Sequence, residues 1–241
     1  MTRDVGVTRA VQEWLPEWTL TAFSGVSLLG DLLVIVPALG LLYLADVGRT
    51  LRRGDTDHPL CSDRTAFLVA TVFGGLALIV FLEAVFGLGR PPAEWHVIDP
   101  SEYGFPSGHT MAATVFWGAL AWWAPIGRRP RRVVAAGVVV GLVGLSRLAL
   151  GVHYLVDVVA AVAFGVVYLA LIGRIGRARP GRAFGVALGI ALAAVVVTGG
   201  GGRASLALAG TVGAAVGWWV IERPAVRDRV FETVGRLRQR S

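Results

Sequence analysis

Long apolar runs dominate the chain and alternate with short polar segments. Seven runs approach the ~20 residues that a transmembrane helix needs. Pro, Gly and Arg separate the runs, as in 128–130, 173–174 and 199–202. Because lipid offers the backbone no hydrogen-bond partners, helices rather than strands are expected for such runs. The expected spans are residues 25–45, 66–88, 107–126, 133–152, 154–173, 183–200 and 204–221.

Two polar segments flank these runs. Residues 5–22 hold Trp14, Leu15, Trp18 and Leu20 among polar residues, which is typical of a short interfacial helix. The first 20 residues lack an apolar core and a small-residue cleavage site, so no cleavable signal peptide is expected. We therefore expect an all-α membrane bundle with an interfacial segment 1–24, a transmembrane domain 25–221 with its core at 66–173, and a basic cytoplasmic tail 222–241.

Composition supports this class of protein. The chain is 55% hydrophobic and 16% charged, whereas soluble domains carry about 25% charged residues. All 23 basic residues are arginine, and the net charge is +7. In a soluble protein this balance would suggest nucleic acid as a partner. Here the arginines lie in loops between apolar runs, so they favour membrane orientation and contact with anionic lipid headgroups, and no nucleic-acid partner is expected.

The arginines gather in alternate loops. Under the positive-inside rule, this distribution predicts an N-terminus outside the cell membrane and a C-terminus in the cytoplasm. The arginine-poor loops 89–106 and 199–203 then lie outside. The arginine-rich loops carry Arg49, Arg52, Arg53 and Arg64, then Arg128, Arg129, Arg131 and Arg132, then Arg174, Arg177, Arg179 and Arg182, and six more follow the last run.

Ionisable residues within or beside apolar runs are costly and mark candidate functional positions. In the expected topology, four helix ends bring such residues to the outer membrane level. The second run ends there, the third begins there, the fourth ends there and the fifth begins there. The candidates are Asp31, Glu83, Arg90, His109, Arg147, His153 and Asp157.

The types of these residues indicate phosphate chemistry. Arg90 and Arg147 carry planar guanidinium groups that bind phosphate oxygens in a bidentate manner. Ser107 and Gly108 precede a helix, whose first backbone N–H groups form an anion site. Glycine there allows the backbone to approach a phosphate closely. Ser107 is also expected to cap this helix.

Two histidines supply the reactive groups in this interpretation. His153 and Asp157 are four residues apart and share a helix face. The carboxylate is expected to accept a hydrogen bond from one ring nitrogen, which leaves the other free to attack phosphorus. His109 remains as the general acid for the leaving oxygen.

The motifs now show a resemblance to a known family. Arg90-Pro91, Pro106-Ser107-Gly108-His109, and Ser146-Arg147 with His153 and Asp157 resemble the three signature motifs of the type 2 phosphatidic acid phosphatase superfamily, over about residues 66–173. The resemblance implies a phosphohistidine at His153, His109 as acid, and Arg90, Arg147, Ser107 and Gly108 around the phosphate. It implies no metal and no other cofactor.

One position departs from the family pattern. The family has a lysine seven residues before the arginine of the first motif, and this chain has Glu83 there. A carboxylate facing a phosphate would repel it, so we expect Glu83 to hold an arginine from behind the phosphate site. Arg90 and Arg147 are the two candidate partners.

The sequence thus predicts hydrolysis of a lipid phosphomonoester or isoprenoid diphosphate at the outer membrane face. Phosphatidate, isoprenoid diphosphates and glycerophosphate-type lipids all remain as substrates. Two alternatives stay open: a lipid phosphotransferase, and a non-catalytic lipid-binding protein motivated by Glu83.

Overall fold

The computed structural model describes residues 3, 6–54, 56, 58–125, 127–176 and 179–238, without the side chains of 237 and 238. Two of the loop and tail arginines, Arg177 and Arg240, lie outside these residues. Within the described part of the chain all regular structure is helical, as expected. The elements in order are α1 Val7–Trp14, α2 Trp18–Ser27, η1 Leu28–Gly30, α3 Leu32–Arg53, α4 Asp63–Phe86, η2 Ala93–Trp95, α5 Gly108–Trp123, α6 Arg129–Ala149, α7 Leu155–Gly176, α8 Pro180–Thr198, α9 Gly202–Ile221 and α10 Pro224–Arg238.

Six of the described helices are long and apolar enough to cross a membrane: α3, α4, α6, α7, α8 and α9. The chain is a multi-pass membrane protein. Seven spans were expected, and the difference lies in run 107–126, which forms α5. This helix has only 16 residues. At 1.5 Å per residue it extends ~24 Å, less than the ~30 Å of a bilayer core, so the predicted orientation, with its two termini on opposite sides, requires this short helix to cross together with its flanking residues.

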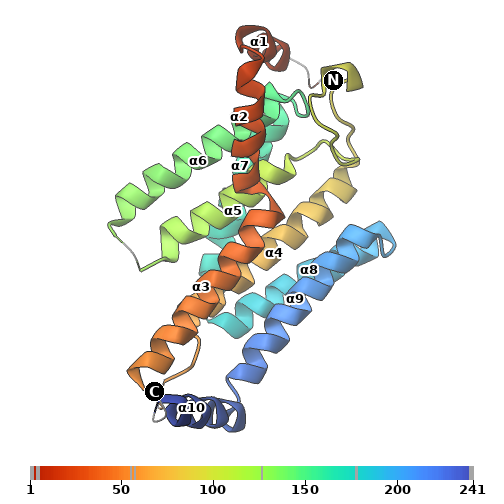
Figure 1. Ribbon diagram of the computed structural model, residues 1–241. Helices are drawn as coiled ribbons and strands as arrows, with labels where there is room; N and C mark the ends of the chain where they lie inside the picture. Colours follow the sequence, from red (N-terminus) through yellow and green to blue (C-terminus); the bar gives the residue numbers. More distant parts are fainter. Residues whose placement is uncertain are drawn as a thin grey trace.

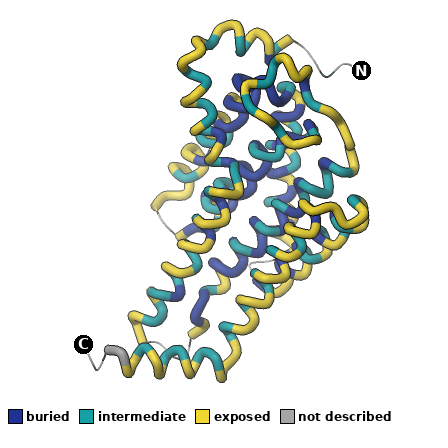
Figure 2. The backbone as a smooth tube through the Cα atoms, turned by 45° about the vertical axis from the view of Figure 1, so that its right-hand side comes forward, coloured by how far each residue is buried: buried dark blue, intermediate teal, exposed yellow. Residues whose placement is uncertain are grey.

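The short α5 lies at the centre of the bundle. It packs against α4, α6 and α7, and α4 in turn packs along most of α8. Met111 and Val115 of α5 are fully buried, and Phe116 is nearly so. Figure 2 shows the buried residues gathered along the inner helices, with exposed residues on the outside. The helix that begins with the Pro-Ser-Gly-His motif is therefore enclosed by protein over most of its length.

The N-terminal segment forms two helices rather than the single interfacial helix expected for 5–22. Leu15 has an extended backbone, and Pro16 follows it, so α1 ends at Trp14. Trp14 and Trp18 are 88% and 77% exposed, as an interfacial segment requires. The opposite side of α1 packs onto the bundle, where Gln12 donates hydrogen bonds to the carbonyls of Trp95 and Ala149.

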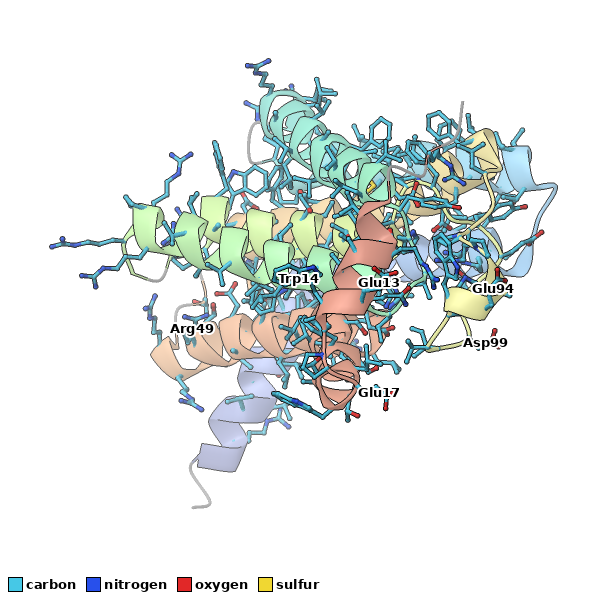
Figure 3. All side chains as sticks on the ribbon, turned by 90° about the horizontal axis from the view of Figure 1, so that it is seen from above. Glu13, Trp14, Glu17, Arg49, Glu94 and Asp99 are labelled. Carbon is cyan, nitrogen blue, oxygen red and sulfur yellow. The ribbon has the colours of Figure 1, made fainter. Side chains whose placement is uncertain are left out.

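The two ends of the bundle differ in charge. Helix α1 and the loop between α4 and α5 lie at one end, and α10 lies at the other (Figure 1). Figure 3 looks onto the first end, with Glu13, Trp14 and Glu17 on the N-terminal segment and Glu94 and Asp99 on the loop. Acidic residues occur at both ends, so the difference in charge comes from the arginines, most of which lie in the loops and tail at the α10 end, which the positive-inside rule places in the cytoplasm.

This orientation predicts a labelling pattern. In a Cys61→Ser background, Glu102→Cys should react with a membrane-impermeant thiol reagent in intact cells, and Arg129→Cys should react only after permeabilisation. Both positions are exposed, and α5 separates them. The native Cys61 is buried, and burial is the main reason that its pKa rises to about 12. Protection of position 102 together with labelling of position 129 would reverse the topology.

Candidate functional site

The site lies at the end of the bundle that carries α1, where four helix ends meet. Arg90 follows α4, Ser107 precedes α5, Arg147 lies in the last turn of α6, and His153 precedes α7. Direct contacts join these segments: the Nη1 atom of Arg90 lies 2.8 Å from the Nε2 atom of His153. The Ser107 N–H donates to the carbonyl of Asp157 over 3.1 Å. Arg90 thus contacts His153, and the beginning of α5 is bonded to the first turn of α7.

His153 is held in one tautomer. Its imidazole is 1% exposed, and its Nδ1 atom lies 2.8 Å from the carbonyl oxygen of Gly104. A carbonyl only accepts, so Nδ1 carries the proton and Nε2 presents a lone pair. The Nη1 group of Arg90 donates to this lone pair and also to the carbonyl of Val152. The nitrogen that carries the lone pair is therefore Nε2, and the N–H of Arg90 occupies it in this structure.

Asp157 does not make the hydrogen bond expected for it. Its Oδ2 atom lies 3.6 Å from Nδ1 of His153. The N–H of that nitrogen donates its hydrogen bond to the carbonyl of Gly104 instead. The Oδ2 atom accepts from the backbone N–H of Tyr154 at 2.8 Å. The Oδ1 atom pairs with Nη1 of Arg3 at 2.9 Å. The fully buried carboxylate thus acts on His153 through its charge and fixes the turn that carries it.

His109 has a carboxylate partner, Asp31, and no contact between these two residues was expected from the sequence. Its Nε2 atom lies 3.1 Å from Oδ2 of Asp31. Asp31 is the N-cap of α3, and its Oδ1 atom accepts from the N–H of Leu33 at 2.8 Å. This second bond fixes the direction of the carboxylate. The side chain of His109 is 32% exposed, in contrast to the enclosed His153.

The beginning of α5 is open to an anion. Ser107 occupies the N-cap position, but its hydroxyl pairs with Oγ1 of Thr110 at 2.9 Å and caps no backbone N–H, contrary to the expected capping role. The first backbone N–H groups of α5 have no partner within the helix. A Cβ atom on Gly108 would lie 3.0 Å from Oε1 of Glu83, so only glycine fits without displacing that carboxylate.

Arg147 is a buried cation with unpaired N–H groups among the described residues. Its side chain is 2% exposed, and its Nε and Nη1 atoms have no hydrogen-bond partner among the described residues. A buried charge costs several kcal/mol unless it is paired. An anionic ligand oxygen is the partner that such a guanidinium selects.

Glu83 holds an arginine, but neither of the two expected. Its carboxylate is 2% exposed, and Oε2 lies 2.7 Å from Nη1 of Arg203 at the beginning of α9. Helix α4 ends at Phe86, and Gly87 follows with φ 57°. Arg90 therefore leaves the helix axis and does not lie two turns along the same face. No sequence motif marked Arg203 or Arg3, because both lie far from the motif segments along the chain.

A cavity of about 490 Å³ adjoins these residues. One part of its wall is polar, and the rest is formed by apolar side chains of α3, α4 and α9. The polar lining consists of Asp31, Glu83, Arg90, Ser101, His109 and Arg203. The apolar lining includes Leu32, Val36, Phe73, Leu76, Val80 and Leu206.

Fold and site together define a helical membrane protein with a two-histidine, arginine-rich anion site. Residues 64–180 match the PAP2 superfamily, which is the type 2 phosphatidic acid phosphatase superfamily indicated by the motifs, and the chain belongs to it. Phosphatidylglycerophosphatase B of Bacillus subtilis (strain 168) is 33% identical over 82 residues, which cover 32% of this chain. The chain spans 40% of the length of that curated relative.

A solved structure shares the fold. The crystal structure of the first transmembrane PAP2 type phosphatidylglycerolphosphate phosphatase from Bacillus subtilis is similar with a TM-score of 0.56. The similarity covers 71% of this chain and 83% of that chain at 23% sequence identity. At this identity the likeness concerns the arrangement of the helices.

The tautomer of His153 leads to a prediction. Burial is the main cause that lowers the pKa of His153 to about 4; Asp157 opposes this shift and Arg90 adds to it. The ring should therefore stay neutral between about pH 8 and about pH 5, where an ordinary histidine titrates. NMR of ¹⁵N-histidine-labelled protein, assigned with His153→Gln, should show a neutral ring protonated at Nδ1. A midpoint near the ordinary histidine value of about 6.5 would contradict this.

Proposed function

We propose that the chain hydrolyses a lipid phosphomonoester or diphosphate through a phosphohistidine on His153. The observation that supports this most strongly is a pair of adjacent groups. Nε2 of His153 presents its lone pair beside Arg90, and the buried Arg147 has N–H groups without a partner among the described residues. A neutral nucleophile and a cation with unpaired N–H groups are what in-line attack on a phosphoryl group needs.

The chemistry proceeds in two balanced steps. Nε2 of His153 attacks phosphorus while the bond between phosphorus and the lipid oxygen breaks. His109 donates a proton to that oxygen, and the product lipid leaves. Water then attacks the phosphohistidine, and neutral His109 accepts a proton from it, which releases inorganic phosphate and regenerates both histidines.

Each remaining residue has a place in this scheme. Arg90, Arg147 and the N–H groups that follow Ser107 and Gly108 bind the phosphoryl oxygens. Asp157 stabilises the positive charge that develops on His153 during attack. Asp31 orients His109. Glu83 stands behind Gly108, at the position where the family has a lysine.

The shape of the cavity supports a lipid as the substrate. Its polar wall accommodates a phosphate headgroup, and its apolar wall continues along helices that face the membrane. The relative named above makes phosphatidylglycerophosphate the first substrate to test. The arginine distribution supports a site at the outer face of the cell membrane.

The central test is phosphate release from a panel of lipid phosphates by purified protein. The panel contains phosphatidylglycerophosphate, phosphatidate and an isoprenoid diphosphate. His153→Ala should abolish release, and His109→Ala should lower kcat by about 10²–10⁴-fold, as expected for loss of a general acid. Arg129→Gln, at the opposite end of the bundle, serves as a control. Near-wild-type release by the His153 variant would refute the mechanism, and lipid phosphorylation without free phosphate would indicate a phosphotransferase.

The same assay tests the expectation of no metal. No group of three or more His, Cys, Asp or Glu side chains with the geometry of a metal site occurs within the described ranges. Activity should therefore persist in EDTA and be inhibited by vanadate, which mimics five-coordinate phosphorus. Loss of activity in EDTA with recovery on adding Mg²⁺ would contradict this prediction.

A further inference from the structure

We propose that Arg203, at the beginning of α9, binds the substrate phosphate and is positioned for this task by Glu83. The proposal rests on the proposed function and adds one residue to its binding site. Arg203 lies beyond residues 64–180, the segment that matches the family. The cation that the family motif supplies from the position of Glu83 would then come from a different helix.

The ion pair between the two residues is asymmetric. Glu83 is 2% exposed, whereas the side chain of Arg203 is 51% exposed. The pair joins Nη1 of the guanidinium to Oε2 of Glu83 as an ion pair, and Oε2 makes no hydrogen bond of ordinary geometry within the described residues. A guanidinium has five N–H donors, so most of them remain available. Glu83 thus holds one N–H group of Arg203 from the buried side and does not engage the other N–H donors of the guanidinium.

Helix α9 presents one face to the cavity, and Arg203 is the first residue of that face. Leu206, Ala207 and Gly210 follow it in the cavity lining. Their offsets of three, four and seven residues from Arg203 are those of a single helical stripe. Arg203 therefore lines the cavity at the beginning of α9, and the apolar residues of the same helix face line the cavity beyond it.

The cavity also brings Arg203 close to the reacting groups. Arg90, Gly108 and His109 line the same cavity. Oε1 of Glu83 lies 3.0 Å from the point where a Cβ of Gly108 would be, immediately behind the first turn of α5. A phosphate at that turn lies within reach of a guanidinium held on the other oxygen of Glu83. A phosphate dianion with Arg90, Arg147 and Arg203 around it is compensated even though Glu83 adds a negative charge.

A simpler role for Arg203 would be to neutralise Glu83, and a double-mutant cycle separates the two. The variants are Arg203→Gln, Glu83→Gln and the double variant Glu83→Gln/Arg203→Gln. The readouts are the affinity of the purified full chain for inorganic phosphate and the KM and kcat for the best lipid substrate. Arg129→Gln is the matched control, because it removes an arginine from the opposite end of the bundle.

If Arg203 binds phosphate, Arg203→Gln should weaken phosphate affinity and raise KM by about 10- to 100-fold. This is the effect expected for loss of a charge-assisted hydrogen bond. The effect on kcat should be smaller. The double variant should remain equally impaired. It contains no unpaired buried carboxylate, so it also answers the question if Arg203→Gln alone fails to fold. Glu83→Lys/Arg203→Gln should recover affinity, because it returns a cation to the cavity from α4.

Wild-type phosphate affinity in the double variant would overturn the proposal, since only neutralisation of Glu83 would then matter. Wild-type affinity in Arg203→Gln would overturn it as well. The binding readout is independent of turnover. A wild-type chain that binds phosphate in an Arg203-dependent manner but releases none from any lipid would refute the proposed hydrolysis and leave Arg203 as an anion ligand.

Discussion

The hydrogen bond from Nδ1 of His153 to the carbonyl of Gly104 is the interaction on which the site depends. It determines the tautomer, and the tautomer decides that Nε2 faces Arg90. The buried ring is thus held between the carbonyl of Gly104 at Nδ1 and the guanidinium of Arg90 at Nε2. The loop between α4 and α5 therefore contributes to the chemistry through a backbone atom, and its path from Arg90 to Ser107 is a functional constraint.

Periodicity and motif spacing predicted most of the bundle and the core of the site. The apolar runs correspond to α3 through α9, and charge alternation brought Arg90, His109, Arg147 and His153 to one level. The partners of these residues were harder to predict. A four-residue spacing brings Asp157 near His153 but does not show that a carbonyl lies closer. Likewise, a seven-residue spacing linked Glu83 to Arg90 only for a helix that continued past Gly87.

Three segments outside residues 64–180 complete the charge balance of the site. Arg3 pairs with Asp157, Asp31 with His109, and Arg203 with Glu83. In each pair, one residue lies inside the matched segment and the other lies outside it. Two of the pairs join opposite charges, and the pair of Asp31 and His109 joins an acid to a base. Buried ionisable groups need such partners, because removing one leaves an uncompensated charge in a medium of low dielectric constant. Long-range pairs of this kind leave no local pattern in a sequence, and all three therefore emerge only from the fold.

Arg147 is the exception that shows where the substrate charge belongs. It is as deeply buried as Glu83, yet its Nε and Nη1 atoms have no hydrogen-bond partner within the described chain. In a site where Asp157 and Glu83 each pair with an arginine, a buried guanidinium with unpaired N–H groups is suited to an anionic ligand. Flanking segments thus neutralise Asp157 and Glu83, whereas in the proposed mechanism the substrate phosphate neutralises Arg147. In the proposed mechanism, Arg147 thus contributes to selectivity for an anionic headgroup because its buried N–H groups lack partners within the described chain.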